Sequence, residues 1–478
     1  MLSRRSLIHG LGAAAGAGLL LGPGRSALGQ LRSVLTAEAD GFIHLRAAPS
    51  IVSLLGPGKP NTPVWAYNDQ VPGPELRVKA GQPIRVRLHN GLPDTTTIHW
   101  HGMHLPNRMD GVPGLTQRPV EPGETFDYEF TPPYAGTYWY HSHFRTEEQS
   151  DRGLYGPLIV EEPSPMAVDR DLWLIIDDWR LLDNGCIDEA TFGDRREWAR
   201  EGRLGNVFTI NGTVAPTFRA SRGERVRLRC VNASNAKVLA FDLPGLPLWL
   251  IAWDGQTLPE PVRYANRNID LGPGQRADFF IDIPGNAPDQ VVPRMFSSGQ
   301  AIPLTTLEID GPQRAPRSEA LVLTPSVMTP LDLTRTRRAD VLIQGGSQSA
   351  RLRGGRNIKA TRDEGLFWTL NGVFGGPHEG LGTGPPLVEA KKGETVIVNM
   401  INQTFYPHAM HLHGHHFRVV ERNGKSVQPG PWRDVEVVPN DESAAFAFVA
   451  GEPGKWLYHC HMVEHHAAGM GGWFNITA

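Results

Sequence analysis

The most constraining feature of the chain is a block of potential metal ligands near its C-terminal end. Cys460 stands between His459 and His461 and is followed by His465 and Met470. A cysteine, two histidines and a weakly bound methionine form the ligand set of an electron-transfer copper. Side chains alternate between the two faces of a strand. We therefore expect His459 and His461 to point away from the metal of Cys460, toward a second metal centre.

Further His-x-His pairs support this interpretation. They are His99 with His101, His141 with His143, and His411 with His413, and His408 lies just before the last pair. The four pairs, His408 and His465 account for ten of the 18 histidines. Zinc is the competing metal, but structural zinc sites usually combine several cysteines and a catalytic zinc needs only three protein ligands. One cysteine among ten histidines favours copper.

The chain also repeats itself three times. A glycine turn, an alternating segment and an asparagine nine residues after the glycine recur at 81–90, 223–232 and 393–402. A second turn followed by an apolar segment recurs at 122–130, 273–281 and 439–448. With 53 glycines and 40 prolines, these short segments predict an all-β protein of three consecutive Greek-key β-sandwich domains. We place the domains at residues 36–163, 164–315 and 335–478.

The spacing within the repeats predicts where the metals lie. His99 and His411 both fall 18 residues after their repeat's glycine, whereas Phe241 occupies that place in the middle repeat. The first and third domains should therefore share a site, and the middle domain should be a spacer without ligands. The same alignment sets Ser142 opposite Cys460, which predicts one cysteine-bound copper rather than two.

The N-terminus has the pattern of a signal peptide, which we place at residues 1–29. Arg4 and Arg5 form a twin-arginine pair, and a Gly/Ala/Leu-rich run too short to span a membrane comfortably follows them. Export by the twin-arginine machinery to a bacterial periplasm is expected, with no membrane span in the mature chain. In that oxidising compartment Cys186 and Cys230 could form a disulfide or remain two inert thiols. The net charge of -3 gives no electrostatic case for nucleic acid.

On these motifs the sequence resembles the three-domain multicopper oxidases: laccases, bilirubin oxidases and bacterial cuprous oxidases. The likeness covers about residues 40–478 and implies cupredoxin-like domains. It also implies four copper ions, one of type 1, one of type 2 and two of type 3, that couple one-electron oxidations to the reduction of O2 to water. The implied type 1 ligands are His408, Cys460, His465 and Met470, and the implied type 2 ligands are His99 and His411. The implied type 3 sets are His101, His141 and His461, and His143, His413 and His459.

Several residues near the motifs have alternative interpretations. Asp110 lies where the family has an acidic residue that relays protons, although Asp110-Gly111 could simply make a turn. Some relatives have a second carboxylate where this chain has His466, and Glu464 is either a substitute or an exposed salt-bridge residue. We interpret His104, His415 and His416 as structural or lining residues, and Trp100, Trp139 and Trp456 as core packing. Because an exposed ligand would admit electrons, His408 or His465 should face a substrate groove.

The substrate is the least constrained part of the prediction. Oxidation of Cu(I) is usually associated with methionine-rich segments, because thioethers suit cuprous ion. The chain has 10 methionines and no methionine-rich run, and Met103, Met109 and Met462 near the motifs are equally explained by packing. We expect a laccase-like oxidase of phenolic or similar small reductants. A periplasmic cuprous oxidase is the alternative, and a copper-storage or exported scaffold protein is the non-enzymatic one.

Overall fold

The computed structural model describes residues 34–264, 269–297, 300–311, 314–315, 321–347, 363–375 and 384–478. Regular structure in this part of the chain is almost entirely β-strand, which confirms the predicted all-β class. The expected signal peptide at 1–29 lies outside the described residues. None of the described helices is long and apolar enough to cross a membrane.

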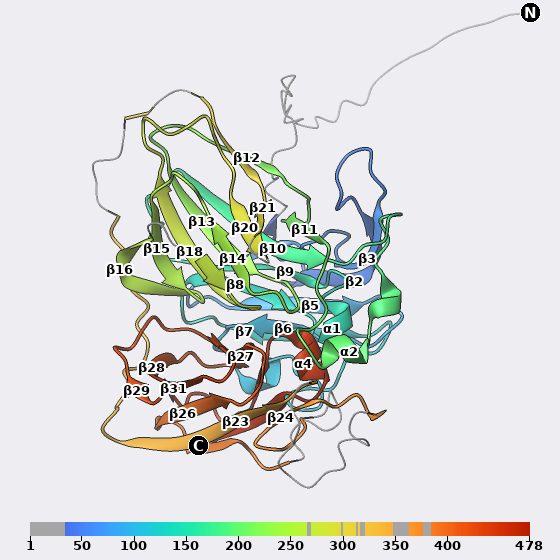
Figure 1. Ribbon diagram of the computed structural model, residues 1–478, viewed down its shortest axis with the longest axis vertical. Coiled ribbons are helices and arrows are strands. Elements are labelled where there is room, and N and C mark those ends of the chain that lie inside the picture. Colours follow the sequence, from blue (N-terminus) through green and yellow to red (C-terminus); the bar gives the residue numbers. More distant parts are fainter. Residues whose placement is uncertain are drawn as a thin grey trace, which may run out of the picture.

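The described strands of the first and third domains form two sheets each (Figure 1). In the first domain, one sheet has the strand order β3 (Thr62–Tyr67), β2 (Ile43–Val52), β5 (Ile84–Asn90), β7 (Thr125–Phe130). The other sheet has the order β1 (Val34–Leu35), β4 (Glu75–Lys79), β9 (Tyr155–Glu161), β8 (Gly136–His141), β6 (His99–His101). In the third domain, one sheet has the strand order β24 (Trp368–Leu370), β23 (Thr336–Gly345), β26 (Thr395–Asn402), β31 (Ser443–Val449), β28 (Arg418–Arg422), β29 (Lys425–Ser426). The other sheet has the order β25 (Val388–Lys391), β33 (Gly471–Thr477), β32 (Gly454–Cys460), β27 (His408–Leu412), β30 (Val435–Val438).

The described part of the middle domain has one large sheet and two small ones. The large sheet has the order β11 (Val207–Ile210), β10 (Arg170–Trp179), β13 (Arg225–Asn232), β18 (Arg276–Asp282), β15 (Leu248–Trp253), β16 (Gln256–Tyr264). The small sheets are β17 (Ile269–Leu271), β14 (Leu239–Asp242), β20 (Arg294–Ser297), β21 (Gln300–Pro303), and β12 (Thr217–Ala220), β22 (Thr306–Ile309), β19 (Gln290–Val291).

Short helices lie between strands within each of the three domains. They are η1 (Asn107–Met109), α1 (Thr146–Gln149), η2 (Glu189–Thr191), α2 (Arg195–Trp198) and α4 (Val463–Ala467). α4 contacts both α1 and α2, so one helix from each domain meets at a single place (Figure 1).

The threefold repeat of the sequence is also present in the structure. β5, β13 and β26 hold equivalent places, each between a parallel and an antiparallel neighbour. At their ends Asn90, Asn232 and Asn402 each accept, on the side-chain oxygen, the backbone amide two residues on, at 3.0 Å. Each also donates its side-chain amide to backbone carbonyls of its own repeat. The recurring asparagine is therefore a corner that satisfies buried backbone groups three times over.

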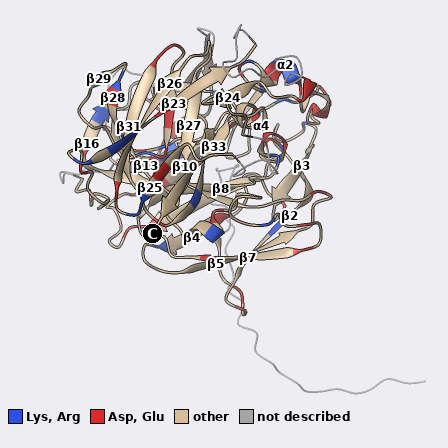
Figure 2. Cartoon of the chain, turned by 90° about the horizontal axis from the view of Figure 1, so that it is seen from below, with Lys and Arg blue, Asp and Glu red and all other residues tan. Residues whose placement is uncertain are grey.

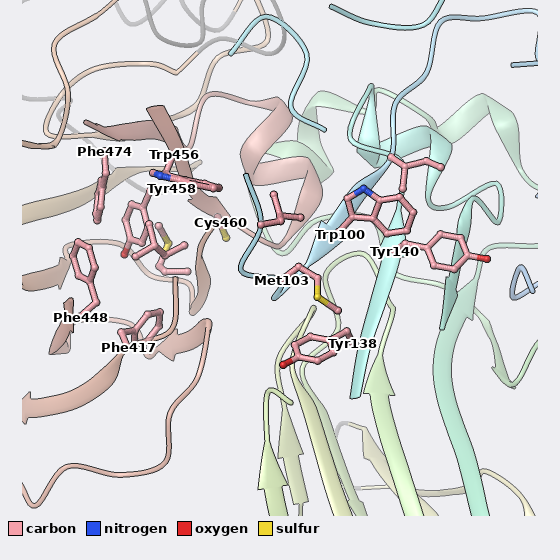
Figure 3. Close-up of a cluster of buried hydrophobic side chains, with 14 of the residues drawn as sticks. Trp100, Met103, Tyr138, Tyr140, Phe417, Phe448, Trp456, Tyr458, Cys460 and Phe474 are labelled. Atoms are coloured by element: carbon pink, nitrogen blue, oxygen red, sulfur yellow. The ribbon is translucent and has the colours of Figure 1, made fainter. Parts of the chain in front are cut away.

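One hydrophobic core runs through the first and third domains, and a separate one fills the middle domain. Figure 3 shows Trp100 and Tyr140 on the side of the first domain and Trp456 and Tyr458 on the side of the third, with Cys460 between them. Trp139 is also buried, so the three tryptophans beside the motifs pack in the interior, as predicted.

The structure also shows how the charged residues are distributed and in what state Cys186 and Cys230 are found. Acidic and basic residues are interspersed over the chain (Figure 2). Cys186 is half-buried, Cys230 is buried, and both are free thiols. The structure therefore favours the two-thiol alternative over a disulfide.

Candidate metal centre

A first cluster of donor atoms lies within the third domain, between β27 and α4. The Sγ of Cys460 lies 3.7 Å from the Nδ1 of His408 and 3.6 Å from the Nδ1 of His465. These two ring nitrogens are 3.0 Å apart. All three side chains are fully buried, and their donor atoms are close enough together to hold one metal ion.

The outer nitrogen of each imidazole fixes its tautomer. His465 Nε2 lies 2.6 Å from the backbone carbonyl of Arg200, which can only accept, so this nitrogen carries the proton. His408 Nε2 lies 2.8 Å from the hydroxyl of Thr404, which donates to Asn402 and therefore accepts from the ring. Both Nδ1 atoms then present lone pairs to each other. Such an arrangement fits a cation held between them and the sulfur of Cys460.

The protonation state of Cys460 also depends on whether a cation is bound. Burial raises the pKa of Cys460 to about 12, so the thiolate would need a bound metal to persist. Met470 is fully buried beside it, and its backbone carbonyl accepts the amide of Cys460 at 3.1 Å. The turn after α4 thus returns the predicted axial methionine to the strand that carries the cysteine.

The expectation that His408 or His465 faces a substrate groove is wrong. Both side chains are 0% exposed. The middle domain covers them, because the chain after α2 brings the Arg200 carbonyl onto His465. Trp368 packs against both rings, at 4.5 Å from His465 and 5.0 Å from His408. Its Nε1 donates to the carbonyl of Trp198 in α2, which ties the cover to the third domain.

A second, larger cluster lies between the first and third domains. The eight histidines of the four His-x-His pairs meet there, and each is at most 2% exposed. β6 pairs with β8 and β27 with β32, so His99 is opposite His141 and His411 is opposite His459. As the alternation along the strand predicts, Cys460 faces the first cluster, whereas His459 and His461 face this one.

The second cluster has the donor chemistry of a metal site. In the described part of the chain, inward ring nitrogens without a hydrogen-bond partner are His99 Nε2, His101 Nδ1, His141 Nε2, His143 Nε2, His411 Nε2 and both nitrogens of His461. His413 Nε2 and His459 Nε2 face each other at 3.1 Å. Their other nitrogens are bonded to Asp110 and to the Cys460 carbonyl, so the facing atoms again present lone pairs. Orphaned and facing lone pairs of this kind fit bound cations.

Asp110 bridges the two domains at this cluster. Its backbone carbonyl accepts His99 Nδ1 at 2.8 Å, and its Oδ2 accepts His413 Nδ1 at 2.9 Å. Burial raises the pKa of the Asp110 carboxyl. The residue does more than form a turn, and its Oδ1 lies 3.4 Å from His99 Nδ1.

Asp434 makes the same pair of contacts from the third domain and was missed in the sequence. Its carbonyl accepts His411 Nδ1 at 2.9 Å, and its Oδ1 accepts His101 Nε2 at 3.1 Å. Although burial opposes the effect, the charge of Arg276 lowers the pKa of Asp434 well below its ordinary value. Asp434 is 23 residues after His411, whereas Asp110 is 11 after His99, so no common spacing could have revealed it.

The remaining polar residues near the clusters mostly keep the roles expected of them. His104 and His416 are bonded to each other at 2.9 Å, and His415 Nδ1 bonds the carbonyl of His413. The His466 ring lies 4.4 Å from that of His459. Glu464, however, is not an exposed salt-bridge residue. It is 1% exposed, accepts from Asn235 of the middle domain at 3.0 Å, and burial raises its pKa to about 8.

The middle domain is also more than a spacer. The donor groups found among the described residues come from the first and third domains, as predicted. However, Gly274 lies directly against the rings of His101 and His461, and Arg276 binds Asp434. The sequence alignment assigned no ligand to this domain, and it could not show this contact, because the contact arises from packing between domains.

Comparisons with known proteins agree with this chemistry. Three family profiles, each described as multicopper oxidase, match residues 52–165, 171–295 and 357–478. A solved multi-copper oxidase from Pseudomonas thermotolerans is 32% identical with a TM-score of 0.80, covering 91% of this chain and 98% of that one. Copper resistance protein A of Escherichia coli is 26% identical over 98% of both chains. Laccase-1 of Botryotinia fuckeliana is 27% identical over 85% of this chain and 77% of its own.

Proposed function

This chain belongs to the multicopper oxidase family of copper-dependent oxidoreductases, and on that premise we propose which residues bind its copper and which reductant it oxidises. His408, Cys460, His465 and Met470 would bind the type 1 ion, and His99 and His411 the type 2 ion. The type 3 ions would be bound by His101, His141 and His461, and by His143, His413 and His459. Membership in an oxidase family favours this function over copper storage or a scaffold.

The observation that carries the proposal is the connection between the two clusters. Cys460 belongs to the first cluster, and its two neighbours in the chain belong to the second. When bound, the copper ions would accept single electrons at the first cluster and reduce O2 to water at the second. Three consecutive residues then join the two reactions through covalent bonds, over the shortest path that a chain can offer.

Protons and water are controlled by the residues around the second cluster. Asp110 is buried, its carboxyl has a raised pKa, and its Oδ2 already holds His413, so it is placed to carry a proton to this cluster. Burial of all eight histidines excludes bulk water from the second cluster, where the bound copper ions would supply the reduction of O2.

The segment of the middle domain that covers the first cluster indicates which kind of reductant the protein would oxidise. Electrons from a substrate bound on the outer face of residues 195–203 would reach His465 through the carbonyl of Arg200, which accepts a hydrogen bond from His465. This segment contains no methionine, and Met103 and Met462 are buried in the core. Because residues 195–203 offer no thioether to bind cuprous ion, a phenolic or similar organic reductant is favoured over Cu(I).

Oxygen uptake by the copper-loaded protein tests the assignment. With a phenol and with cuprous ion supplied under matched conditions, uptake should be faster with the phenol. Faster uptake with Cu(I) would make the protein a cuprous oxidase of the copper-resistance type. Absence of uptake with either reductant would contradict the oxidase assignment.

The domain limits and the cellular location are part of the same proposal. The three domains would occupy residues 36–163, 164–315 and 335–478, after a signal peptide at 1–29. The twin arginines Arg4 and Arg5 support export by the twin-arginine machinery to the periplasm. Replacing both with lysine should leave the protein in the cytoplasmic fraction, and unchanged periplasmic recovery would refute this route.

A further inference from the structure

A buried arginine of the middle domain reaches the histidine cluster. Arg276 begins β18 and is 0% exposed. Its Nη1 and Nη2 each donate to an oxygen of Asp434 at 2.7 Å, and Nη1 also donates to the carbonyl of Gly274 at 3.1 Å. A buried guanidinium is tolerated only when it is paired and hydrogen-bonded, and this bidentate geometry is the strongest form of such a pair.

Asp434 passes this restraint to two histidines. The Oδ1 of Asp434 accepts a hydrogen bond from His101 Nε2, so the lone pair of that ring is on Nδ1. The backbone carbonyl of Asp434 accepts a hydrogen bond from His411 Nδ1, so the lone pair of that ring is on Nε2. The free nitrogens, His101 Nδ1 and His411 Nε2, are the orphaned ones. A shift of Asp434 would therefore turn two inward-facing nitrogens together.

A second carboxylate holds the backbone at the same place. Asp254 Oδ2 accepts the amide of Asp434 at 3.1 Å, and its Oδ1 accepts the amide of Arg276 at 2.8 Å. Asp254 and Arg276 both belong to the middle domain, on the chain just after β15 and in β18. The middle domain thus grips Asp434 by side chain and backbone, whereas the ion pairs of the equivalent Asp110, among the described residues, are with His99 and His413.

We propose that Arg276 is a positioning residue of the three-copper site, which sets the tautomers and angles of His101 and His411 by fixing Asp434. This inference rests on the ligand assignment proposed above. The middle domain then has a direct part in the geometry of a site to which it gives no ligand. Residues that orient metal ligands typically change metal affinity by about 10–100-fold when replaced.

The test is Arg276→Lys, which keeps the charge but cannot bind both oxygens in a fixed plane. The control is Arg229→Lys. Arg229 is another buried arginine of the middle domain, bonded to both oxygens of Asp171 at 2.7 Å, and it touches none of the histidines proposed as ligands. Copper per chain, the type 1 absorbance and the type 2 electron paramagnetic resonance signal are measured on wild type and both variants.

We expect Arg276→Lys to shift or lose the type 2 signal, with copper retention weaker by about 10–100-fold, while the type 1 absorbance stays. Arg229→Lys should lower thermal stability and leave the spectra unchanged. A wild-type type 2 signal with full copper in Arg276→Lys would overturn the inference. A wild-type protein that binds copper but shows no type 2 signal would instead contradict the ligand assignment.

If Arg276→Lys does not fold, Arg276→Gln combined with Asp434→Asn removes both buried charges and keeps a hydrogen-bonded pair. We expect the type 2 signal of this double variant to differ from wild type, because without the charged pair the Asp434 carbonyl no longer holds His411, a proposed type 2 ligand, in the same place. A wild-type signal in the double variant would show that the charged pair is not needed, and would also overturn the inference.

Discussion

Gly274 offers a sharp test of how closely the middle domain approaches the proposed three-copper site. A Cβ at this position would lie 2.9 Å from Cε1 of His101 and 3.0 Å from Cδ2 of His461. Ordinary van der Waals contact begins at 3.4 Å, so the rings or the turn must move by 0.5 and 0.4 Å to accept an alanine. A metal site tolerates errors in ligand distance of only about 0.2 Å. Gly274→Ala should therefore disturb copper binding itself.

The backbone adds a second, separable penalty. Gly274 has φ +82°, and the left-handed region costs alanine about 1–2 kcal/mol. Gly123 occupies the equivalent turn of the first repeat, has φ +83° and has nothing within 4 Å of a Cβ. In the third repeat the equivalent residue is Asp441 at φ +56°, so the turn accepts a side chain where there is space. Gly123→Ala thus carries the backbone penalty without the contact.

The assay compares the two variants by thermal unfolding, copper content and the type 2 resonance signal. Both should lose stability, at about 2–4 °C per kcal/mol. Only Gly274→Ala should also lose copper, because the rings it would contact belong to His101 and His461, both proposed type 3 ligands. A change in the type 2 signal would show that the rest of the three-copper site is disturbed as well. If both variants gave the wild-type signal with full copper, the close approach of the middle domain would have no effect on the site, and this reasoning would be refuted.

Further predictions follow from the clusters. Cys460→Ser should abolish the blue absorbance and turnover while the type 2 signal persists, and activity surviving in this variant would contradict the proposed electron path. Asp110→Asn can keep the hydrogen bond to His413 but cannot carry a proton, so turnover should fall by about 10²–10⁴-fold with the type 1 absorbance unchanged; turnover close to wild type would remove its relay role. Burial raises the pKa of Glu464 from 4.5 to about 8. Between these two pH values the folded state binds more protons than the unfolded state, so the free energy of unfolding falls as pH rises. Glu464→Gln should flatten this fall between about pH 5 and pH 8, as measured by melting temperature, and parallel curves for both proteins would refute it.

The fold and the metal motifs could be predicted because their signals are local. The asparagine corners at Asn90, Asn232 and Asn402 satisfy backbone groups of their own repeat, so the same spacing recurs wherever the same corner is built. The alternation around Cys460 is equally local, since it follows from the geometry of one strand.

The residues that were missed or misplaced depend on contacts between domains. Arg276 and Asp434 are 158 residues apart, and nothing in the local sequence of either predicts their pairing. The burial of His465 depends on a carbonyl of the middle domain, 265 residues away. Glu464 is a charged residue of the kind usually found on the surface, but its side chain is hydrogen-bonded to Asn235 of another domain. Spacing within a repeat cannot show which loop of a different repeat will cover it.

The first domain shows what the repeat does at the type 1 position without a metal. Ser142 is the counterpart of Cys460, and Thr96, 15 residues after its repeat's glycine, is the counterpart of His408. Their hydroxyl oxygens are 3.3 Å apart, and both lie within hydrogen-bond distance of Gln149 Oε1, at 2.6 and 2.7 Å. Gln149 ends α1, whose place beyond β8 matches that of α4 beyond β32. Hydrogen-bonded neutral groups thus fill the position that in the third domain presents facing lone pairs and a thiol. Whether this position offers the donor set of the proposed copper site therefore depends on a few side chains rather than on the fold, which both domains share.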